Sequence, residues 1–173
     1  WLDQAHGGPQ LLIGHSLGGA AVIVAAHDIP QVKAVVTIGA PSDAAHVIKA
    51  IRTHVEQIED EGEAEVQLAG RPFVLKRQFL DDVRGANVTE AAAGLKRPLL
   101  VMHAPLDETV GIGNATALFV AARHPKSFIS LDKADHLLTS PGDAQRAGKL
   151  IAVWAEPYVF DAGAAMPVQE TGG

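Results

Sequence analysis

The chain of 173 residues contains no cysteine, few aromatic residues and no long hydrophobic segment. Without cysteine it forms no disulfide and offers neither thiol chemistry nor a cysteine-ligated zinc site. Aromatic residues make up 5% and the net charge is −6, which disfavours binding to nucleic acid or to an anionic membrane. No apolar run reaches the roughly 18 residues that a membrane span requires. We therefore expect a cytoplasmic protein that binds neither nucleic acid nor membrane.

The hydrophobic content of 47% and a mean hydropathy of +0.13 are typical of a globular chain, long enough for one domain. Short apolar, β-branched runs alternate with stretches rich in alanine and leucine. The predicted strands are 10–13, 32–38, 99–103 and 127–131, and the helices that follow the first, third and fourth are 17–27, 112–123 and 143–154. This alternation predicts an α/β fold, with a parallel sheet flanked by helices.

Residues 44–95 interrupt this alternation. They contain two helical stretches, 44–58 and 79–93, around a β-hairpin that pairs 65–68 with 73–76. We predict that 44–95 is a lid-like insertion with a hairpin and helices, within a partial domain that spans residues 1–157. Residues 158–173 are predicted to form a mobile tail.

Residues 14–19 read Gly-His-Ser-Leu-Gly-Gly and contain the pattern Gly-x-Ser-x-Gly between a predicted strand and a predicted helix. This pattern is typical of a nucleophilic serine on a tight strand-to-helix turn, the nucleophile elbow, where glycines leave room for the crowded backbone. Ser16 is then the candidate nucleophile, and Gly14 and Gly18 are the glycines of the turn. The backbone N–H of Leu17 is a candidate oxyanion donor. The alternative is a glycine-rich turn in which Ser16 only caps the helix.

A nucleophilic serine needs a general base, and the base needs a carboxylate that orients it. Asp107 follows the third predicted strand and His136 the fourth, in the chain order serine, acid, histidine. Because parallel strands end at the same edge of a sheet, we expect Ser16, Asp107 and His136 to converge there. Glu108 and Asp43 stay open as alternative acids, although Asp43 is also placed to cap a helix.

The other histidines are interpreted as structural or exposed, including His15 inside the elbow pattern and His103 at a strand end. None shows the spacing of metal ligands, and we expect neither a metal nor a cofactor. The expected ligand is a small-molecule acyl substrate. Phe73, Phe79 and Leu80 of the insertion either line a pocket for it or pack the lid.

Several segments together resemble the α/β-hydrolase domain of bacterial hydrolase–OsmC fusion proteins. They are residues 14–21 (Gly-His-Ser-Leu-Gly-Gly-Ala-Ala), 37–43, 77–82, 103–110 and 134–138. The resemblance covers about residues 4–155 and implies Ser16 as nucleophile, Asp107 as acid and His136 as base. It also implies that an OsmC-like domain, which depends on cysteines, is fused in the full-length protein.

The domain of that family begins with further strands and a loop that supplies a second oxyanion donor, and this chain has no counterpart of them. We therefore interpret the chain as the C-terminal part of an α/β-hydrolase fold. The expected activity is that of a carboxylesterase-like serine hydrolase, weakened because one missing oxyanion donor typically costs about 10²–10³ in rate. The alternative is a non-catalytic scaffold or binding module that serves a fused partner domain.

In this interpretation the strand before Ser16 lies at an open sheet edge and exposes Leu11, Leu12 and Ile13. An apolar edge of this kind pairs readily with other chains. We predict that the chain alone is poorly soluble or self-associates, as measured by size-exclusion chromatography with light scattering. A monodisperse monomer that unfolds cooperatively would contradict this prediction.

Overall fold

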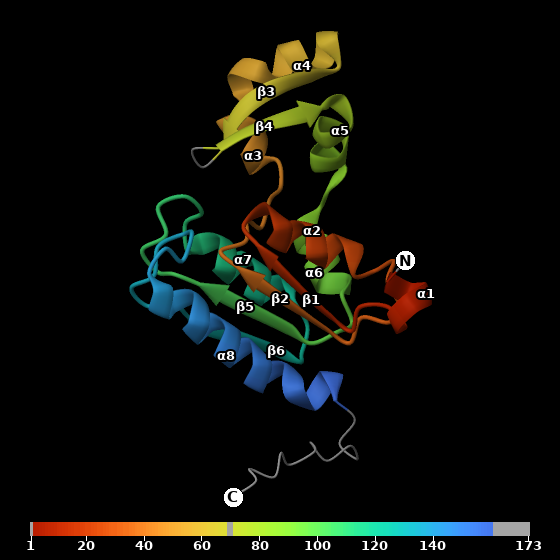
Figure 1. Cartoon of the computed structure of the whole chain (residues 1–173), viewed down its shortest axis with the longest axis vertical. Helices are drawn as coiled ribbons and strands as arrows, with labels where there is room; N and C mark the ends of the chain where they lie inside the picture. The colour runs from red at the N-terminus through yellow and green to blue at the C-terminus, as the bar shows by residue number, and fades with distance from the viewer. Residues whose placement is uncertain (1, 69–70, 161–173) are drawn as a thin grey trace, which may run out of the picture.

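The computed structural model describes residues 2–68 and 71–160, and its body is a four-stranded sheet. Helices lie on both faces of this sheet (Figure 1). All four strands are parallel, in the spatial order β1-β2-β5-β6. The predicted α/β class with a parallel sheet is confirmed. The strands are β1 (Leu11–His15), β2 (Ala34–Ile38), β5 (Leu99–His103) and β6 (Lys126–Ser130).

The two central strands are more deeply buried than the two outer ones. All of β5 and four of the five residues of β2 are buried, which is typical of parallel strands covered on both faces. Within the described residues β1 pairs with β2 alone, and Ile13 is 50% exposed. The expected edge strand is therefore present, but the prediction that it exposes Leu11 and Leu12 is wrong, because both are half-buried and pack against the core clusters. Self-association through this edge stays a prediction.

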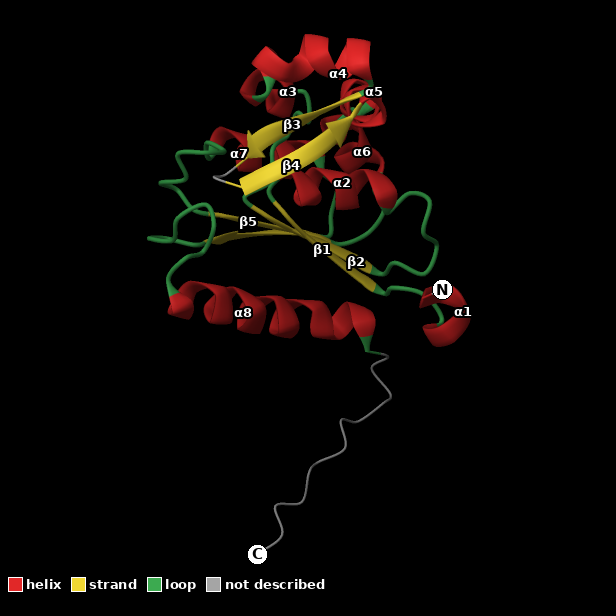
Figure 2. Cartoon of the chain, turned by 45° about the horizontal axis from the view of Figure 1, so that its top comes forward, coloured by secondary structure: helices red, strands yellow, loops and turns green. Residues whose placement is uncertain are grey.

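Helices cover the two faces of the sheet unequally (Figure 2). One long helix, α8, lies along one face, and three shorter helices lie on the other face together. A short helix, α1, precedes the first strand. The bounds are α1 (Leu2–His6), α2 (Leu17–Ala25), α6 (Val88–Gly94), α7 (Gly113–Ala121) and α8 (Pro141–Val159).

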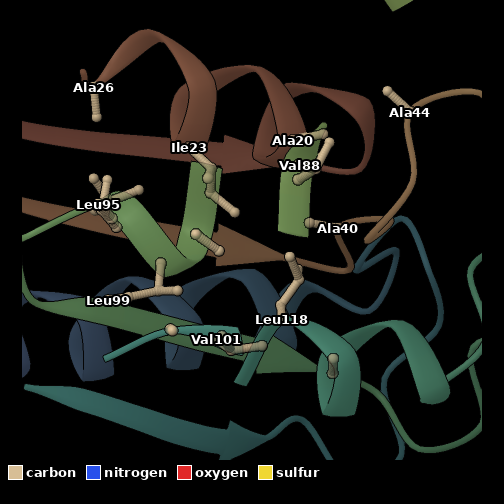
Figure 3. Close-up of a cluster of buried hydrophobic side chains, with 14 of the residues drawn as sticks. Ala20, Ile23, Ala26, Ala40, Ala44, Val88, Leu95, Leu99, Val101 and Leu118 are labelled. Carbon is tan, nitrogen blue, oxygen red and sulfur yellow. The ribbon is translucent and has the colours of Figure 1, made fainter. Parts of the chain in front are cut away.

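The core is divided by the sheet into two clusters. Successive side chains of a strand point to opposite faces, so Val35 and Val101 pack with Ile23 and Leu118 under α2, α6 and α7 (Figure 3). On the other face their strand neighbours pack against α8. The position of each helix is thus determined by the alternating apolar residues of β2 and β5.

A smaller unit lies beyond α2, at the end of the molecule away from the C-terminus (Figure 1). It consists of helices packed on an antiparallel hairpin, as predicted, and has its own core around Ile58, Val66 and Leu80. Residues 69–70 of the hairpin lie outside the described residues. The elements are α3 (His46–Ala50), the 3-10 turn η1 (Arg52–His54), α4 (Val55–Glu61), β3 (Glu63–Leu68), β4 (Arg71–Lys76) and α5 (Arg77–Gly85).

Both helices predicted within 44–95 are interrupted. The first is divided at Ile51 and η1, where Ile, Thr and His have lower helix propensity than Ala or Leu. The second ends at Gly85, and Asn87 starts α6 because its side chain accepts the N–H of Glu90 at 3.1 Å.

The predicted boundaries also shift at two places. α6 packs in the main core through Val88 and Ala92, so the last part of segment 44–95 belongs to the sheet's helical layer. α8 runs past Pro157 to Val159, so residues 158–159 of the predicted tail are helical. The tail residues 161–173 lie outside the described residues. In the described part of the chain, no helix combines the length and apolarity needed to cross a membrane.

Candidate active site

Ser16 occupies a strained position between β1 and α2. Its φ of 54° and ψ of −128° lie in a region that residues with a side chain rarely adopt. The N–H of Ser16 donates to the carbonyl of Ile38 at 2.8 Å, and its own carbonyl accepts the N–H of Gly19 at 2.9 Å. Leu17 is the first residue of α2, so its N–H has no partner within the helix. The turn therefore has the shape that the elbow pattern predicts.

Glycine is required in this turn at positions 14 and 19. A Cβ added to Gly14 would lie 2.2 Å from the carbonyl oxygen of Gly18, and one added to Gly19 would lie 2.5 Å from the Cβ of Ala40. A Cβ at Gly18 would meet no atom within 4 Å. The expectation that Gly18 leaves room for the backbone is wrong, because its missing side chain would face open space. Gly19 is the second crowded glycine.

Ser16, His136 and Asp107 are joined by two hydrogen bonds, which we call the hydrogen-bond chain. His136 Nδ1 lies 2.7 Å from Asp107 Oδ2, and His136 Nε2 lies 3.0 Å from Ser16 Oγ. A carboxylate only accepts hydrogen bonds, so Nδ1 carries the proton and donates a hydrogen bond to Asp107. In a neutral imidazole Nε2 is then unprotonated and accepts the Ser16 hydroxyl. This tautomer, inferred from the partners, is the one that a general base requires.

Asp107 is held on both of its carboxylate oxygens. Oδ1 accepts the N–H groups of Thr109 at 2.9 Å and Val110 at 2.8 Å, which leaves Oδ2 for His136. The Asp107 side chain is only 1% exposed. This burial alone would raise the pKa of the carboxyl, but the hydrogen bonds from Val110, His136 and Thr109 outweigh it and lower the pKa below its usual value. Asp107 is therefore ionised at neutral pH.

Two further residues lie beside Asp107: Gly39, which was not among the candidates from the sequence, and His103, which was interpreted there as structural. Gly39 follows β2 with φ +57°, and a Cβ there would lie 3.3 Å from both Asp107 Oδ2 and His136 Nδ1. The fully buried His103 donates from Nε2 to the carbonyl of Val110 at 2.7 Å, which steadies the turn that holds Asp107. Its Nδ1 has no hydrogen-bond partner in the described structure. The position of Gly39 directly after a predicted buried strand was the feature of the sequence that could have indicated its place next to the site.

The alternative acids do not contact His136. The exposed Asp43 accepts the N–H of Ala45 at 2.9 Å, just before α3. Glu108 is exposed. Asp135, which precedes His136 in the chain, was not a candidate acid, and its carboxylate accepts the N–H of Thr139 at 2.8 Å. Among the described residues, no group of three or more histidines and carboxylates is placed to hold a metal ion. Asp107 is thus the carboxylate that the fold brings to His136.

An apolar cavity of about 310 Å³ lies along α2. Leu17 of the elbow is part of its lining, whereas Ser16, Asp107 and His136 are not. Leu17, Ala21 and Val24 of α2 form one wall, and Phe79 and Val83 of α5 form part of the other. Leu80, which was expected either to line a pocket or to pack the lid, is buried in the core of the small unit, and Phe73 is 47% exposed. Of the three predicted lining residues, Phe79 is the one that lines this cavity.

Comparison with solved structures identifies the fold as that of α/β hydrolases. The chain is similar to the esterase domain of a Rhodothermus marinus protein, with 48% identity over 92% of this chain and a TM-score of 0.79. Mouse alpha/beta hydrolase domain-containing protein 10 has a TM-score of 0.64 over 90% of this chain, and at 22% identity it shows the fold alone. The chain spans 65% of the length of each of these two structures. No protein-family model and no curated protein matches the chain.

The glycines of the elbow provide a matched pair of substitutions. We predict that Gly14→Ala lowers the free energy of unfolding by at least about 2 kcal/mol, because the new Cβ overlaps the Gly18 backbone. Gly18→Ala, in open space on a helix, is expected to change it by between zero and about 1 kcal/mol in the stabilising direction. Urea denaturation measures both values. Equal losses in the two variants would contradict the packing described above.

The low pKa of Asp107 also predicts how stability depends on pH. A carboxyl whose pKa is lower in the folded state stabilises the fold above its unfolded pKa, and this stabilisation is lost as the pH falls through the folded pKa. We expect the free energy of unfolding of the wild type to fall more steeply between about pH 5 and pH 2 than that of Asp107→Asn. The pKa of Asp135 is also lowered, by its bonds to Thr139, but this residue is common to both proteins. Parallel curves would refute the assignment.

Proposed function

We propose that the chain carries the active site of a serine hydrolase that acts on an ester or another acyl substrate. The observation that carries this proposal is the pair of hydrogen bonds on His136, 3.0 Å to Ser16 Oγ and 2.7 Å to Asp107 Oδ2. The similarity to an esterase domain at 48% identity supports the same activity. In this proposal Ser16, His136 and Asp107 are a catalytic triad.

The reaction proceeds in two steps. Ser16 Oγ attacks the acyl carbonyl while His136 Nε2 takes its proton, and the same proton then passes to the leaving group. Asp107 keeps Nδ1 protonated and stabilises the imidazolium that forms. The negative charge on the carbonyl oxygen is stabilised by the N–H of Leu17 and by the N-terminus of α2. Water, deprotonated by His136, then releases the acid from Ser16.

The cavity along α2 supports a substrate with an apolar group. Its lining includes Leu17, the residue after Ser16, although Ser16 itself does not line it. Apolar side chains from α2 and α5 form most of its walls. A volume of about 310 Å³ is at the lower end of the range for small-molecule sites. We propose a carboxylesterase-like specificity for small esters. The segments that resemble hydrolase–OsmC proteins support a further proposal, that this domain works beside an OsmC-like domain.

We predict that Ser16→Ala lowers the kcat for p-nitrophenyl acetate by about 10⁴-fold or more, because the nucleophile is lost. The matched control is Ser140→Ala, an exposed serine before α8 whose side chain caps no helix N–H, and it should keep the wild-type rate. Activity of Ser16→Ala at the wild-type rate would overturn the proposal.

A fluorophosphonate probe distinguishes an inactive scaffold from an active serine hydrolase that does not accept p-nitrophenyl acetate as a substrate. Labelling that is lost in Ser16→Ala and kept in Ser140→Ala supports an activated serine. A wild-type protein that neither reacts with the probe nor hydrolyses the ester favours the scaffold.

A further inference from the structure

His15 connects the elbow to the loop that carries His136. It is the last residue of β1, and its exposed side chain reaches across the sheet edge to a residue 121 positions later. His15 Nε2 lies 2.7 Å from the main-chain carbonyl oxygen of His136. A carbonyl oxygen only accepts, so Nε2 of His15 carries the hydrogen and donates it. The two imidazole rings also contact each other, with centroids 5.0 Å apart and planes inclined by 40°.

The loop around His136 is held mainly by bonds to its neighbours. Ala134 donates its N–H to Leu131 O at 2.9 Å, and the Asp135 carboxylate accepts the N–H of Thr139 at 2.8 Å. Leu138 has a φ of +52°, which few residues with a side chain adopt. The bond from His15 acts on the peptide of His136 itself. It therefore positions the backbone from which the imidazole extends.

The imidazole of His136 loses one of its two partners during the reaction. In the free protein its ring is held by Ser16 on Nε2 and by Asp107 on Nδ1. Once Ser16 Oγ is bonded to an acyl group it has no hydrogen left to donate to Nε2. The ring of His136 is then held by Asp107 alone. The backbone of His136 is held by the bond from His15 and by the bonds within its loop.

We propose that His15 is a positioning residue that keeps His136 in place in the acyl-enzyme, where it promotes hydrolysis of the acyl group. In that step water gives a proton to His136 Nε2 and its oxygen bonds to the acyl carbon. The bond from that carbon to Ser16 Oγ then breaks, and Oγ regains a proton from Nε2. This inference rests on the proposed function, and it assigns a role to a residue that the elbow pattern leaves unspecified.

The kinetic test compares His15→Leu, which removes the donor, with His15→Gln, whose amide N–H₂ takes approximately the place of Nε2. For p-nitrophenyl acetate, His15→Leu should lower kcat by roughly threefold to tenfold, the rate equivalent of one neutral hydrogen bond. KM should fall with kcat, because deacylation has become the slow step, and a burst of p-nitrophenol should precede the steady state. His15→Gln should restore kcat to within about twofold of the wild type.

Other kinetic outcomes count against the proposal. An unchanged kcat in His15→Leu would show that the bond has no role in turnover. A lower kcat with an unchanged KM and no burst would place the effect on acylation, as expected of a general disturbance of the site. Failure of His15→Gln to restore the rate would assign the effect to packing of the rings and not to the donated hydrogen bond.

A second measurement does not require turnover. In Ser16→Ala the imidazole lacks its serine partner, as it does in the acyl-enzyme. We expect the hydrogen between His136 Nδ1 and Asp107, whose atoms lie 2.7 Å apart, to give a far-downfield proton NMR signal. This signal is assigned by its absence in His136→Gln. We expect it to persist in Ser16→Ala and in Ser16→Ala/His15→Gln, and to broaden by exchange with water in Ser16→Ala/His15→Leu.

The two measurements distinguish the possible failures. An identical NMR signal in all three proteins would overturn the role of His15 even if esters are hydrolysed. Absence of Ser16-dependent hydrolysis from the wild type would overturn the proposed function. In that case a selective loss of the signal in the leucine variant would still support His15 as the residue that positions His136.

Discussion

The close approach of α2 to the ends of β1 and β2 is the constraint on which the rest of the structure depends. Gly14 lies against the carbonyl of Gly18, and Gly19 lies against Ala40, so the helix leaves the strand almost without a connecting loop. In this turn Ser16 takes a strained backbone conformation that is stabilised by its hydrogen bond to Ile38. A wider turn would remove that strain and also move Oγ away from His136. The packing of glycine on backbone thus determines where the serine hydroxyl points.

The parallel sheet provides the remaining geometry. Asp107 follows β5, and His136 follows β6, so both lie at the carboxyl ends of the strands, where Ser16 follows β1. Ser16 and His136 are 120 positions apart in the chain, and no local element connects them. Their contact depends on the pairing of β1 with β2, β2 with β5, and β5 with β6. The site therefore forms as a property of the assembled sheet.

The sequence predicts the parts of this structure that arise from local patterns. The strand at 99–103 has the predicted bounds, and the alternation of strands and helices gives the correct class. Ser16, Asp107 and His136 were identified because each follows a predicted strand in an order typical of serine hydrolases. Their proximity in the structure agrees with the expected convergence at one sheet edge. Their catalytic roles belong to the proposal.

What the sequence did not predict depends on contacts across the fold. Gly19 is crowded and Gly18 is not, because the orientation of α2 about its axis places Gly19 against Ala40. The bond of His15 depends on the path of a loop more than a hundred residues away. The predicted helix is divided into α5 and α6 because the Asn87 side chain accepts a backbone N–H, and the spacing of apolar residues contains no information about such a bond.

Gly39 is a position next to the site that tolerates no side chain, and it contrasts with other positions nearby that have space for one. A methyl group there would press on the carboxylate and the imidazole together, so no other residue fits without moving both. Gly14 and Gly19 are restricted for a similar reason. Ala21 and Val24, in contrast, are exposed along the apolar cavity and have space around them. Diversification of this scaffold, in nature or in the laboratory, is therefore directed to the outer face of α2 and to the facing side of α5.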